Sequence, residues 1–188
     1  EWAPLTAGLL AQLSAEAGLP DGVLNIVQGI GSTAGAALVA HADIDRISFT
    51  GSTPTARSIG RAAAETLTPV SFELGGKSPF VVLADADLDA AAQTIVAQYM
   101  NAGQVCLSGT RIIVDASVAD ELLEKVRTNA AALVVGDPRL PETRIGPLIH
   151  PTHAARVYVF VERAVKDGAR VFGPRGRHDA GELYFQPT

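Results

Sequence analysis

The sequence predicts an α/β fold with parallel strands, and three observations lead to this fold class. Segments with helical periodicity alternate with short apolar runs that are typical of buried strands. Glycine-rich turns lie where the expected strands pass into helices. Apolar residues make up 47% of the chain and charged residues 19%, a balance typical of a globular protein with a sizeable core. Such alternation implies parallel strands whose following turns gather at one ligand-binding edge of the sheet.

The first part of the chain reads as three helix–strand pairs in the order α-β-α-β-α-β. Apolar spacing, capping hydroxyls and first-turn prolines place the helices, and short apolar runs place the strands. In order, the expected elements are a helix at 4–17, a buried strand at 23–27, a helix that opens in a glycine turn at 29–35 and ends near His41, a strand at 46–50, a helix that follows the turn at 51–54 and ends near Leu67, and a strand at 69–74.

Gly75 and Gly76 interrupt this pattern and are the expected boundary between two domains, residues 1–75 and 76–188. The second part alternates less regularly. Its expected elements are a strand at 80–83, a helix from about Asp87, a loop at 101–109, a strand at 111–114, a helix at 117–133, a loop at 136–149, a helix at 152–167, a strand at 169–172 and a surface loop at 173–182.

Charge and composition exclude several classes of partner. The net charge is −5 and no basic run occurs, which argues against nucleic acid and against an anionic membrane surface. No apolar stretch approaches the roughly 18 residues of a membrane span. The single cysteine cannot form an internal disulfide and fits a reducing compartment, so a cytoplasmic location is expected. Because the chain begins at Glu1 without a methionine, we expect it to be part of a longer protein. Whether a targeting segment precedes Glu1 stays open.

Cys106 is a candidate nucleophile. It lies in a polar loop flanked by Gly103 and Gly109, whereas inert cysteines lie mostly in apolar periodic runs. Such a loop can present the sulfur to a substrate and leave backbone N–H groups free to bind an oxyanion. A lone cysteine is only a candidate, and an inert cysteine remains the alternative.

Glu73 is a candidate general base. It stands at the end of an apolar strand, where a carboxylate would face the ligand edge and be partly desolvated. Partial desolvation makes a carboxylate a better base. The alternative is a carboxylate that merely caps the end of the sheet.

Two glycine turns are candidates for phosphate binding. Gly29-x-Gly31-x-x-x-Gly35 is close to the dinucleotide fingerprint, although its last spacing is longer by one residue. The second turn, Gly51-Ser52-Thr53, follows the next strand. Helix N-termini at such turns offer N–H groups and a positive dipole end to a phosphate.

Taken together, these motifs resemble those of the aldehyde dehydrogenase superfamily. The glutamate motif is FELGGKSP at 72–79, and the cysteine motif is NAGQVC at 101–106 with Arg111 soon after. ISFTGST at 47–53 is similar to the family's nicotinamide-side turn, and GDP at 136–138 and IGPLI at 145–149 resemble later landmarks. The resemblance covers essentially the whole chain, and the order and separation of the first two motifs also fit.

The resemblance implies part of a Rossmann-like parallel-sheet cofactor domain, followed by part of an α/β catalytic domain. It implies that the Cys106 thiolate attacks an aldehyde, that hydride passes to the nicotinamide, and that water activated by Glu73 hydrolyses the resulting thioester. The oxyanion would be held by the N–H of Cys106 and by an asparagine outside this chain. The parent enzyme is expected to be a homodimer or homotetramer.

The resemblance also implies a set of cofactor-binding residues. A carboxylate at Glu1 would bind the ribose hydroxyls and disfavour a 2′-phosphate, so NAD is expected, with NADP as the alternative. Ala56 replaces a glycine that is frequent in the family's second turn, which puts only the closeness of helix packing there in doubt. The implied residues are Glu1, Gly31, Gly35, Phe49, Gly51, Ser52, Leu74 and Gly75.

The sequence leaves the substrate and some alternatives open. The residues around Cys106 resemble those of family members that act on semialdehydes from the breakdown of aromatic compounds. A coenzyme A- or phosphate-acylating enzyme of the superfamily is one alternative, and a non-catalytic nucleotide-binding fragment is another. No metal site is expected, because Asp85-x-Asp87-x-Asp89 lacks the glycine and glutamate of a calcium loop, and the pair His150 and His153 has no further ligand nearby.

Overall fold

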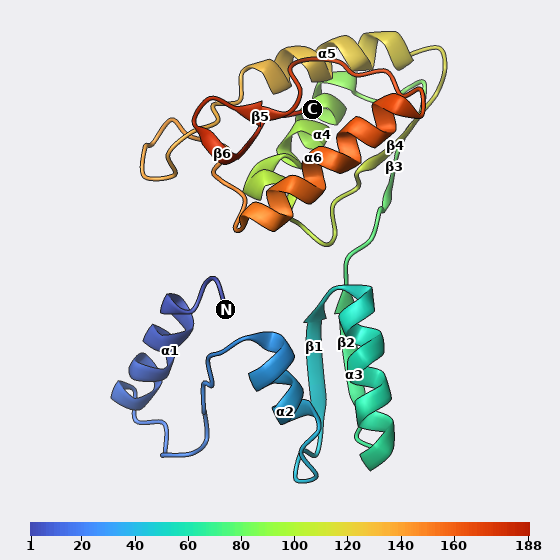
Figure 1. Cartoon of the computed structure of the whole chain (residues 1–188). Coiled ribbons are helices and arrows are strands. Elements are labelled where there is room, and N and C mark those ends of the chain that lie inside the picture. The colour runs from blue at the N-terminus through green and yellow to red at the C-terminus, as the bar shows by residue number, and fades with distance from the viewer. The chain divides into compact units, whose positions relative to one another are not determined.

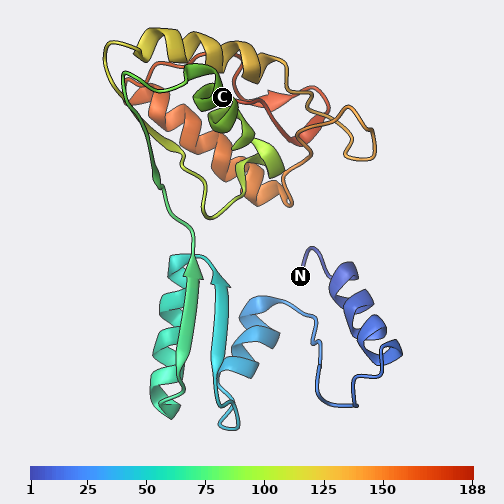
Figure 2. The same ribbon diagram turned by 180° about the vertical axis from the view of Figure 1, so that it is seen from behind.

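A computed structural model describes residues 1–188, and the chain divides into two compact units, residues 1–75 and 76–188 (Figure 1; Figure 2 shows the reverse side). We describe each unit by itself. In both units helices alternate with parallel strand pairs, which confirms the predicted α/β fold class. No helix is both long enough and apolar enough to span a membrane.

Unit 1 contains one parallel strand pair with a helical crossover. Strands β1 (Ile47–Gly51) and β2 (Val70–Leu74) pair in parallel, and helix α3 (Thr53–Thr66) connects them (Figure 1). Helix α1 (Leu5–Glu16) and the short α2 (Ala36–Val39) precede the pair. Helix α3 begins at an N-cap serine followed by a proline in its first turn, and it ends at Leu67 in the left-handed conformation. The predicted helices and these two strands are therefore confirmed to within a few residues.

The predicted buried strand at 23–27 is wrong. These residues form no strand, and Val23, Leu24 and Val27 are exposed by 64%, 41% and 74%. A strand is held by ladder hydrogen bonds to a neighbour, and no segment of this chain pairs with these residues. The leucines of α1 are likewise exposed, so the apolar spacing that places this helix packs against no core in this chain.

Unit 2 is built on a second parallel pair. Strands β3 (Pro79–Val82) and β4 (Arg111–Val114) are joined through helix α4 (Leu88–Ala97), and α5 (Ala119–Ala131) packs against α4. Helix α6 (Pro151–Lys166) and an antiparallel hairpin, β5 (Arg177–His178) and β6 (Gly181–Phe185), complete the unit (Figure 2). The core consists of small and branched apolar side chains from β3, α4 and α5, namely Val82, Ala91, Ala92, Ile95 and Leu122.

Two predictions near the C-terminus are wrong. Residues 169–172 form no strand, because no neighbouring segment offers them a ladder. The expected surface loop at 173–182 instead enters the β5–β6 hairpin, which turns at Asp179 and Ala180. The polar residues of this stretch concealed the hairpin, since strand prediction from sequence depends on apolar alternation.

Candidate active site

The carboxyl ends of β1 and β2 meet at one edge of the sheet in unit 1. The parallel register pairs Thr50 with Glu73 and Gly51 with Leu74. We call these four residues the glutamate edge. The register therefore places a carboxylate, a hydroxyl and a glycine of two motifs side by side, as expected for strand ends in a parallel sheet.

The two faces of this strand pair differ in character. Phe49 and Phe72 are register partners, and their rings make an edge-to-face contact with centroids 6.4 Å apart. A Cβ on Gly60 of α3 would lie 3.7 Å from the Phe72 ring, so α3 covers the phenylalanine face. Because strand side chains alternate, Glu73 projects from the opposite face.

Glu73 is exposed on that opposite face, as are Ser48 and Thr50. The predicted partial desolvation of the carboxylate is therefore not present in this chain. The reason is that α3, which connects the two strands, packs on the phenylalanine face and leaves the glutamate face open to solvent.

Packing against the Phe49 ring requires a glycine at position 51. A Cβ at position 51 would lie 2.5 Å from the Cζ atom of the Phe49 ring, which real Cβ atoms do not reach. The phenylalanine ring thus lies directly over the glycine backbone at the end of β1. A side chain at position 51 would therefore displace the Phe49 ring.

Ser52 serves mainly as the N-cap of α3. Its Oγ accepts a hydrogen bond from the backbone N–H of Thr55 at 3.3 Å, and Pro54 has no N–H. The backbone N–H of Ala56 donates to the Ser52 carbonyl at 2.9 Å. Only the N–H of Thr53 stays unbonded in the first turn, so this helix end offers fewer donors to a phosphate than the sequence suggested.

The first glycine turn is an irregular helical start. Residues Gly31–Gly35 form a single π-helical turn before α2. A Cβ at Gly31 or Gly35 would meet nothing within 4 Å, so the backbone there is open to a ligand. Gly29 is the glycine that packing requires, since its Cβ would come within 2.8 Å of the Ala34 Cβ. The motif spacing alone did not single it out.

Glu1, Leu74 and Gly75 complete the predicted cofactor residues. Glu1 is exposed, and no hydrogen bond or ion pair holds its side chain. Leu74 is half-buried at the glutamate edge, and Gly75 follows it in exposed, irregular backbone. Their predicted roles remain predictions.

Cys106 lies in unit 2, on the loop of residues 103–109, which we call the cysteine loop. The thiol is exposed. The backbone N–H of Ser108 donates to the Val105 carbonyl at 3.3 Å, which makes Cys106 and Leu107 the central residues of a tight turn. The backbone N–H groups of these two central residues donate to no acceptor in the chain. Two donors next to an exposed sulfur are the arrangement that an oxyanion-binding site needs.

A left-handed turn precedes the cysteine loop, and sequence reasoning missed it. Asn101, Ala102 and Gly103 have φ angles of 53°, 53° and 72°. The Asn101 Nδ2 donates to the Gln104 carbonyl at 3.1 Å, and the Gln104 Nε2 donates to the Asn101 carbonyl at 3.0 Å. The alanine pays roughly 1–2 kcal/mol for this conformation. Asn and Gly are frequent in left-handed turns, so NAG was the signal available in the sequence.

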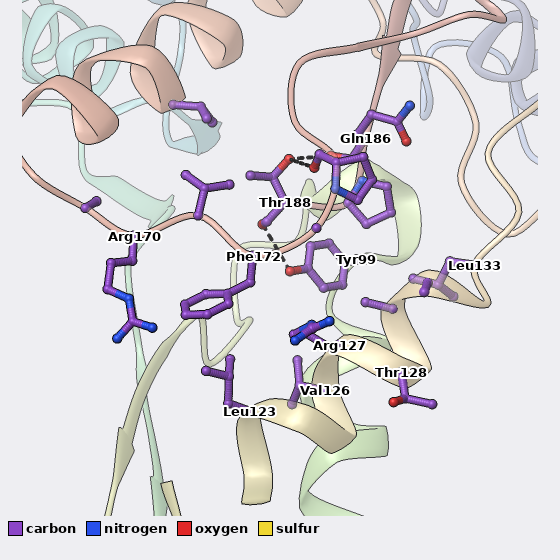
Figure 3. Close-up of a pocket in the computed structure, with 18 of the residues that line it drawn as sticks. Tyr99, Leu123, Val126, Arg127, Thr128, Leu133, Arg170, Phe172, Gln186 and Thr188 are labelled. Atoms are coloured by element: carbon purple, nitrogen blue, oxygen red, sulfur yellow. Dashed lines mark hydrogen bonds between the residues drawn. The ribbon is translucent and has the colours of Figure 1, made fainter. Parts of the chain in front are cut away.

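A cavity of about 640 Å³ lies elsewhere in unit 2, lined by side chains of α5 and α6 and by the C-terminal residues (Figure 3). Its lining includes Tyr99 but not Cys106. The Tyr99 hydroxyl donates to the backbone oxygen of Thr188 at 3.0 Å, and burial raises the pKa of this phenol (Figure 3). This cavity therefore does not coincide with the candidate nucleophile.

Asp137, in the segment at 136–138, forms an ion pair with Arg139. The side chain of Arg139 donates hydrogen bonds to both carboxylate oxygens of Asp137. These bonds, helped by the Arg139 backbone N–H, lower the pKa of Asp137 to about 2. No group of three His, Cys, Asp or Glu side chains in the chain is arranged to hold a metal ion.

Comparison with known proteins identifies the family. The family model described as "Aldehyde dehydrogenase family" matches residues 1–188. The chain belongs to the aldehyde dehydrogenase family. This aldehyde dehydrogenase sequence is 45% identical over its whole length to a mitochondrial aldehyde dehydrogenase of Leishmania tarentolae and covers 38% of that relative. It is 42% identical to a 2-hydroxymuconic semialdehyde dehydrogenase of Pseudomonas sp. (strain CF600) and covers 40% of it.

Solved structures agree with this assignment. A mutant of aldehyde dehydrogenase C from Pseudomonas syringae, in complex with NAD⁺ and octanal, matches 98% of the chain with a TM-score of 0.93 and 40% identity. The chain covers 39% of that protein. It thus spans about two fifths of the length of its relatives, and the predicted resemblance and fold are both confirmed.

Proposed function

We propose that this chain is part of an enzyme that oxidises an aldehyde to a carboxylic acid with NAD as hydride acceptor. Cys106 is the nucleophile and Glu73 the general base. The observation that carries the proposal is the cysteine loop, where an exposed thiol adjoins two backbone N–H groups without an acceptor. The alternative of an inert cysteine explains neither the exposure of the sulfur nor the strained turn before it.

The cysteine loop carries out the first half of the reaction. The Cys106 sulfur forms a bond to the aldehyde carbon, and the carbonyl electron pair moves to oxygen. The N–H of Cys106 and an asparagine outside this chain bind the resulting oxyanion, and the N–H of Leu107, which also has no acceptor, is the next donor along the loop. The nicotinamide, when bound, accepts the hydride from that carbon. The two-electron oxidation leaves the acyl group on Cys106 as a thioester.

Glu73 catalyses the second half of the reaction. Its carboxylate takes a proton from a water molecule, and the water oxygen attacks the thioester carbon. The carbon–sulfur bond breaks, which releases the carboxylic acid and returns the Cys106 thiolate. Glu73 projects from a regular strand and is exposed, so both water and substrate can reach it.

The residues of unit 1 fit a dinucleotide. The backbone at Gly31 and Gly35 is open to close approach, and the Phe49 ring packs against Gly51 at the end of β1. We infer that the first turn binds the adenosine and pyrophosphate part. Phe49, Gly51, Ser52, Leu74 and Gly75 would line the nicotinamide side. The unpaired Glu1 carboxylate would bind the ribose hydroxyls, which favours NAD over NADP.

The substrate class, the location and the assembly belong to the same proposal. The residues around Cys106 suggest a semialdehyde from aromatic breakdown, and the name of one relative, a 2-hydroxymuconic semialdehyde dehydrogenase, agrees with a semialdehyde. The single cysteine supports a cytoplasmic location. We expect a homodimer or homotetramer of the full-length protein, which size-exclusion chromatography with light scattering would measure.

The test of the nucleophile is Cys106→Ala in the full-length protein. NADH formation from a semialdehyde should fall to background, because the Cys106 sulfur forms the covalent bond from which the hydride leaves. Binding of NAD, measured by calorimetry, should be unchanged. Retained NADH formation would refute Cys106 as the nucleophile, and NAD binding without NADH formation by the unmodified protein would favour the non-catalytic nucleotide-binding fragment.

A coenzyme A-acylating reaction would share the first half and differ in the acceptor. Glu73 favours water as acceptor, because a base at that position serves hydrolysis. The products of turnover with and without coenzyme A distinguish the two reactions. Free acid in both assays supports hydrolysis, whereas an acyl-coenzyme A product that needs added coenzyme A would refute it.

A further inference from the structure

The cysteine loop is anchored at both ends to the end of helix α4. At its entrance, the backbone N–H of Gly103 donates to the Tyr99 carbonyl at 3.2 Å. At its exit, the Gln98 Nε2 donates to the Gly109 carbonyl at 3.1 Å. Two consecutive residues, Gln98 and Tyr99, therefore hold the loop that carries Cys106.

The Gln98 amide can take only one orientation. Its Nε2 bonds the Gly109 carbonyl, while its Oε1 is buried and receives no hydrogen bond from the chain. Turning the amide over would place Oε1 against the Gly109 carbonyl oxygen, and two acceptors repel each other. A buried acceptor without a donor is unfavourable. An apolar side chain would fill the same space without this penalty, so the presence of glutamine indicates a need for its donor.

Gly109 is fitted to this contact. A Cβ at position 109 would lie 3.1 Å from the Phe80 Cβ and 3.6 Å from the Gln98 Nε2. The exit of the loop thus lies between β3 and the end of α4 with no room for a side chain. The glycine lets its carbonyl reach the Gln98 amide.

The core gives the loop little other support. A cavity of about 260 Å³ adjoins both loop ends, with Gln98, Gly103 and Gly109 in its lining. Cys106 and Leu107 are exposed, and neither makes a hydrogen bond within the chain. Close packing is thus confined to Ser108 and Gly109 at the loop exit, and the exposed part that carries Cys106 depends on the anchoring hydrogen bonds.

We propose that Gln98 is a positioning residue that holds the exit of the cysteine loop so that the Cys106 sulfur and its neighbouring N–H groups keep their relative geometry. This rests on the proposed role of Cys106 as nucleophile. Gln98 touches neither substrate nor cofactor and acts through Gly109. Misplacement of a nucleophile by a small distance slows the chemical step more than it weakens substrate binding.

Hydrogen exchange of backbone amides in this chain tests the anchoring without need of activity. Gln98→Met keeps the length of the side chain and removes the donor, and Gln98→Lys restores a donor. Gln93→Met is the matched control, because Gln93 is exposed on the same helix. Gln98→Met should speed exchange about 5-fold or more at Ser108 and Thr110, as expected for the loss of one hydrogen bond.

The comparison of amides separates anchoring from a general loss of structure. Ala91 in α4 should exchange at the unmodified rate in Gln98→Met, since its bond to the Asp87 carbonyl does not involve the loop. Gln98→Lys should return Ser108 and Thr110 to within about 2-fold of the unmodified rates, and Gln93→Met should change none. Unchanged exchange in Gln98→Met, or equal acceleration at Ala91, would overturn the proposal.

Kinetics of the full-length protein complete the test. Gln98→Met should lower kcat about 5-fold or more and leave KM within about 2-fold, with recovery in Gln98→Lys. Faster loop exchange with unchanged kcat would refute the positioning role. If Cys106→Ala keeps full activity, the proposed function fails instead, and the exchange result still decides whether Gln98 anchors the loop.

Discussion

Glu73 and Cys106 are held by different means. Glu73 belongs to a regular strand, and the register of β1 and β2 sets its position through backbone hydrogen bonds. Cys106 lies on an irregular loop that depends on a left-handed turn and on the side-chain amides of Gln98, Asn101 and Gln104. The strand-borne group should therefore tolerate changes in neighbouring side chains, and the loop-borne group should not. The following variants test this difference, from the largest expected effect to the smallest.

Glu73→Gln should have the largest effect, because it removes the base and leaves the strand intact. The full-length enzyme should form one equivalent of NADH per active site and then slow by roughly 10²–10⁴-fold, the usual contribution of a general base. Stopped-flow absorbance of NADH measures both phases. Glu65→Gln, at an exposed position near the end of α3, is the control and should turn over normally. Steady turnover in Glu73→Gln would refute the assigned role.

Gly51→Ala tests how firmly the glutamate edge is packed. The new Cβ would clash with the Phe49 ring and displace it from Phe72, which should lower the free energy of unfolding by about 1–3 kcal/mol. Gly31→Ala is the matched control, since a Cβ there meets nothing within 4 Å. Thermal unfolding followed by circular dichroism compares the two. Equal melting temperatures would mean that the ring moves aside without cost.

Ala102→Gly tests the strain before the cysteine loop. Glycine adopts a φ of 53° without penalty, so the variant should gain about 0.5–1 kcal/mol of stability after its larger chain entropy is subtracted. Ala97→Gly, at the end of α4, should instead lose stability. Urea unfolding of both variants gives the difference, and a destabilised Ala102→Gly would show that the left-handed turn is not strained.

The pair of Asp137 and Arg139 should have the smallest effect, since both side chains are reached by solvent. The folded-state pKa of Asp137 is about 2, below the value of an unfolded aspartate near 3.9. Its stabilising contribution is therefore fully present above about pH 4 and is lost as the pH falls toward 2. Melting temperatures of the unmodified chain and of Asp137→Asn should differ at pH 6 and converge near pH 2. A difference independent of pH would contradict this assignment.

The same difference between strand and loop explains what could be predicted. The glutamate edge followed from sequence, because alternation and apolar runs define strands and parallel pairing brings their ends together. The family match confirmed the predicted resemblance to aldehyde dehydrogenases and the predicted fold class. The anchoring of the cysteine loop could not be predicted, because no pattern in the sequence joins Gln98 to Gly109, and the NAG signal at 101–103 does not say that Ala102 itself is left-handed.

The failed strand predictions have a related cause. Residues 23–27 and 169–172 carry strand-like residues, but a strand also needs a neighbour, and the sequence pattern does not report whether one exists. The β5–β6 hairpin is the opposite case, since its partners are adjacent in the chain while its residues look like a loop. The prediction that Glu73 is partly desolvated failed for the same reason as the strand predictions. Burial depends on which faces other segments cover, and the sequence pattern does not report this.

The exposed apolar side chains of residues 23–27 have a consequence for the behaviour of the chain in solution. Val23, Leu24 and Val27 present exposed apolar side chains on a segment without charge or proline. Such segments add to the strand edges of other molecules, which leads to aggregation. Samples of this chain should therefore lose monodispersity as concentration rises, and a lysine in place of Val27 should delay that loss.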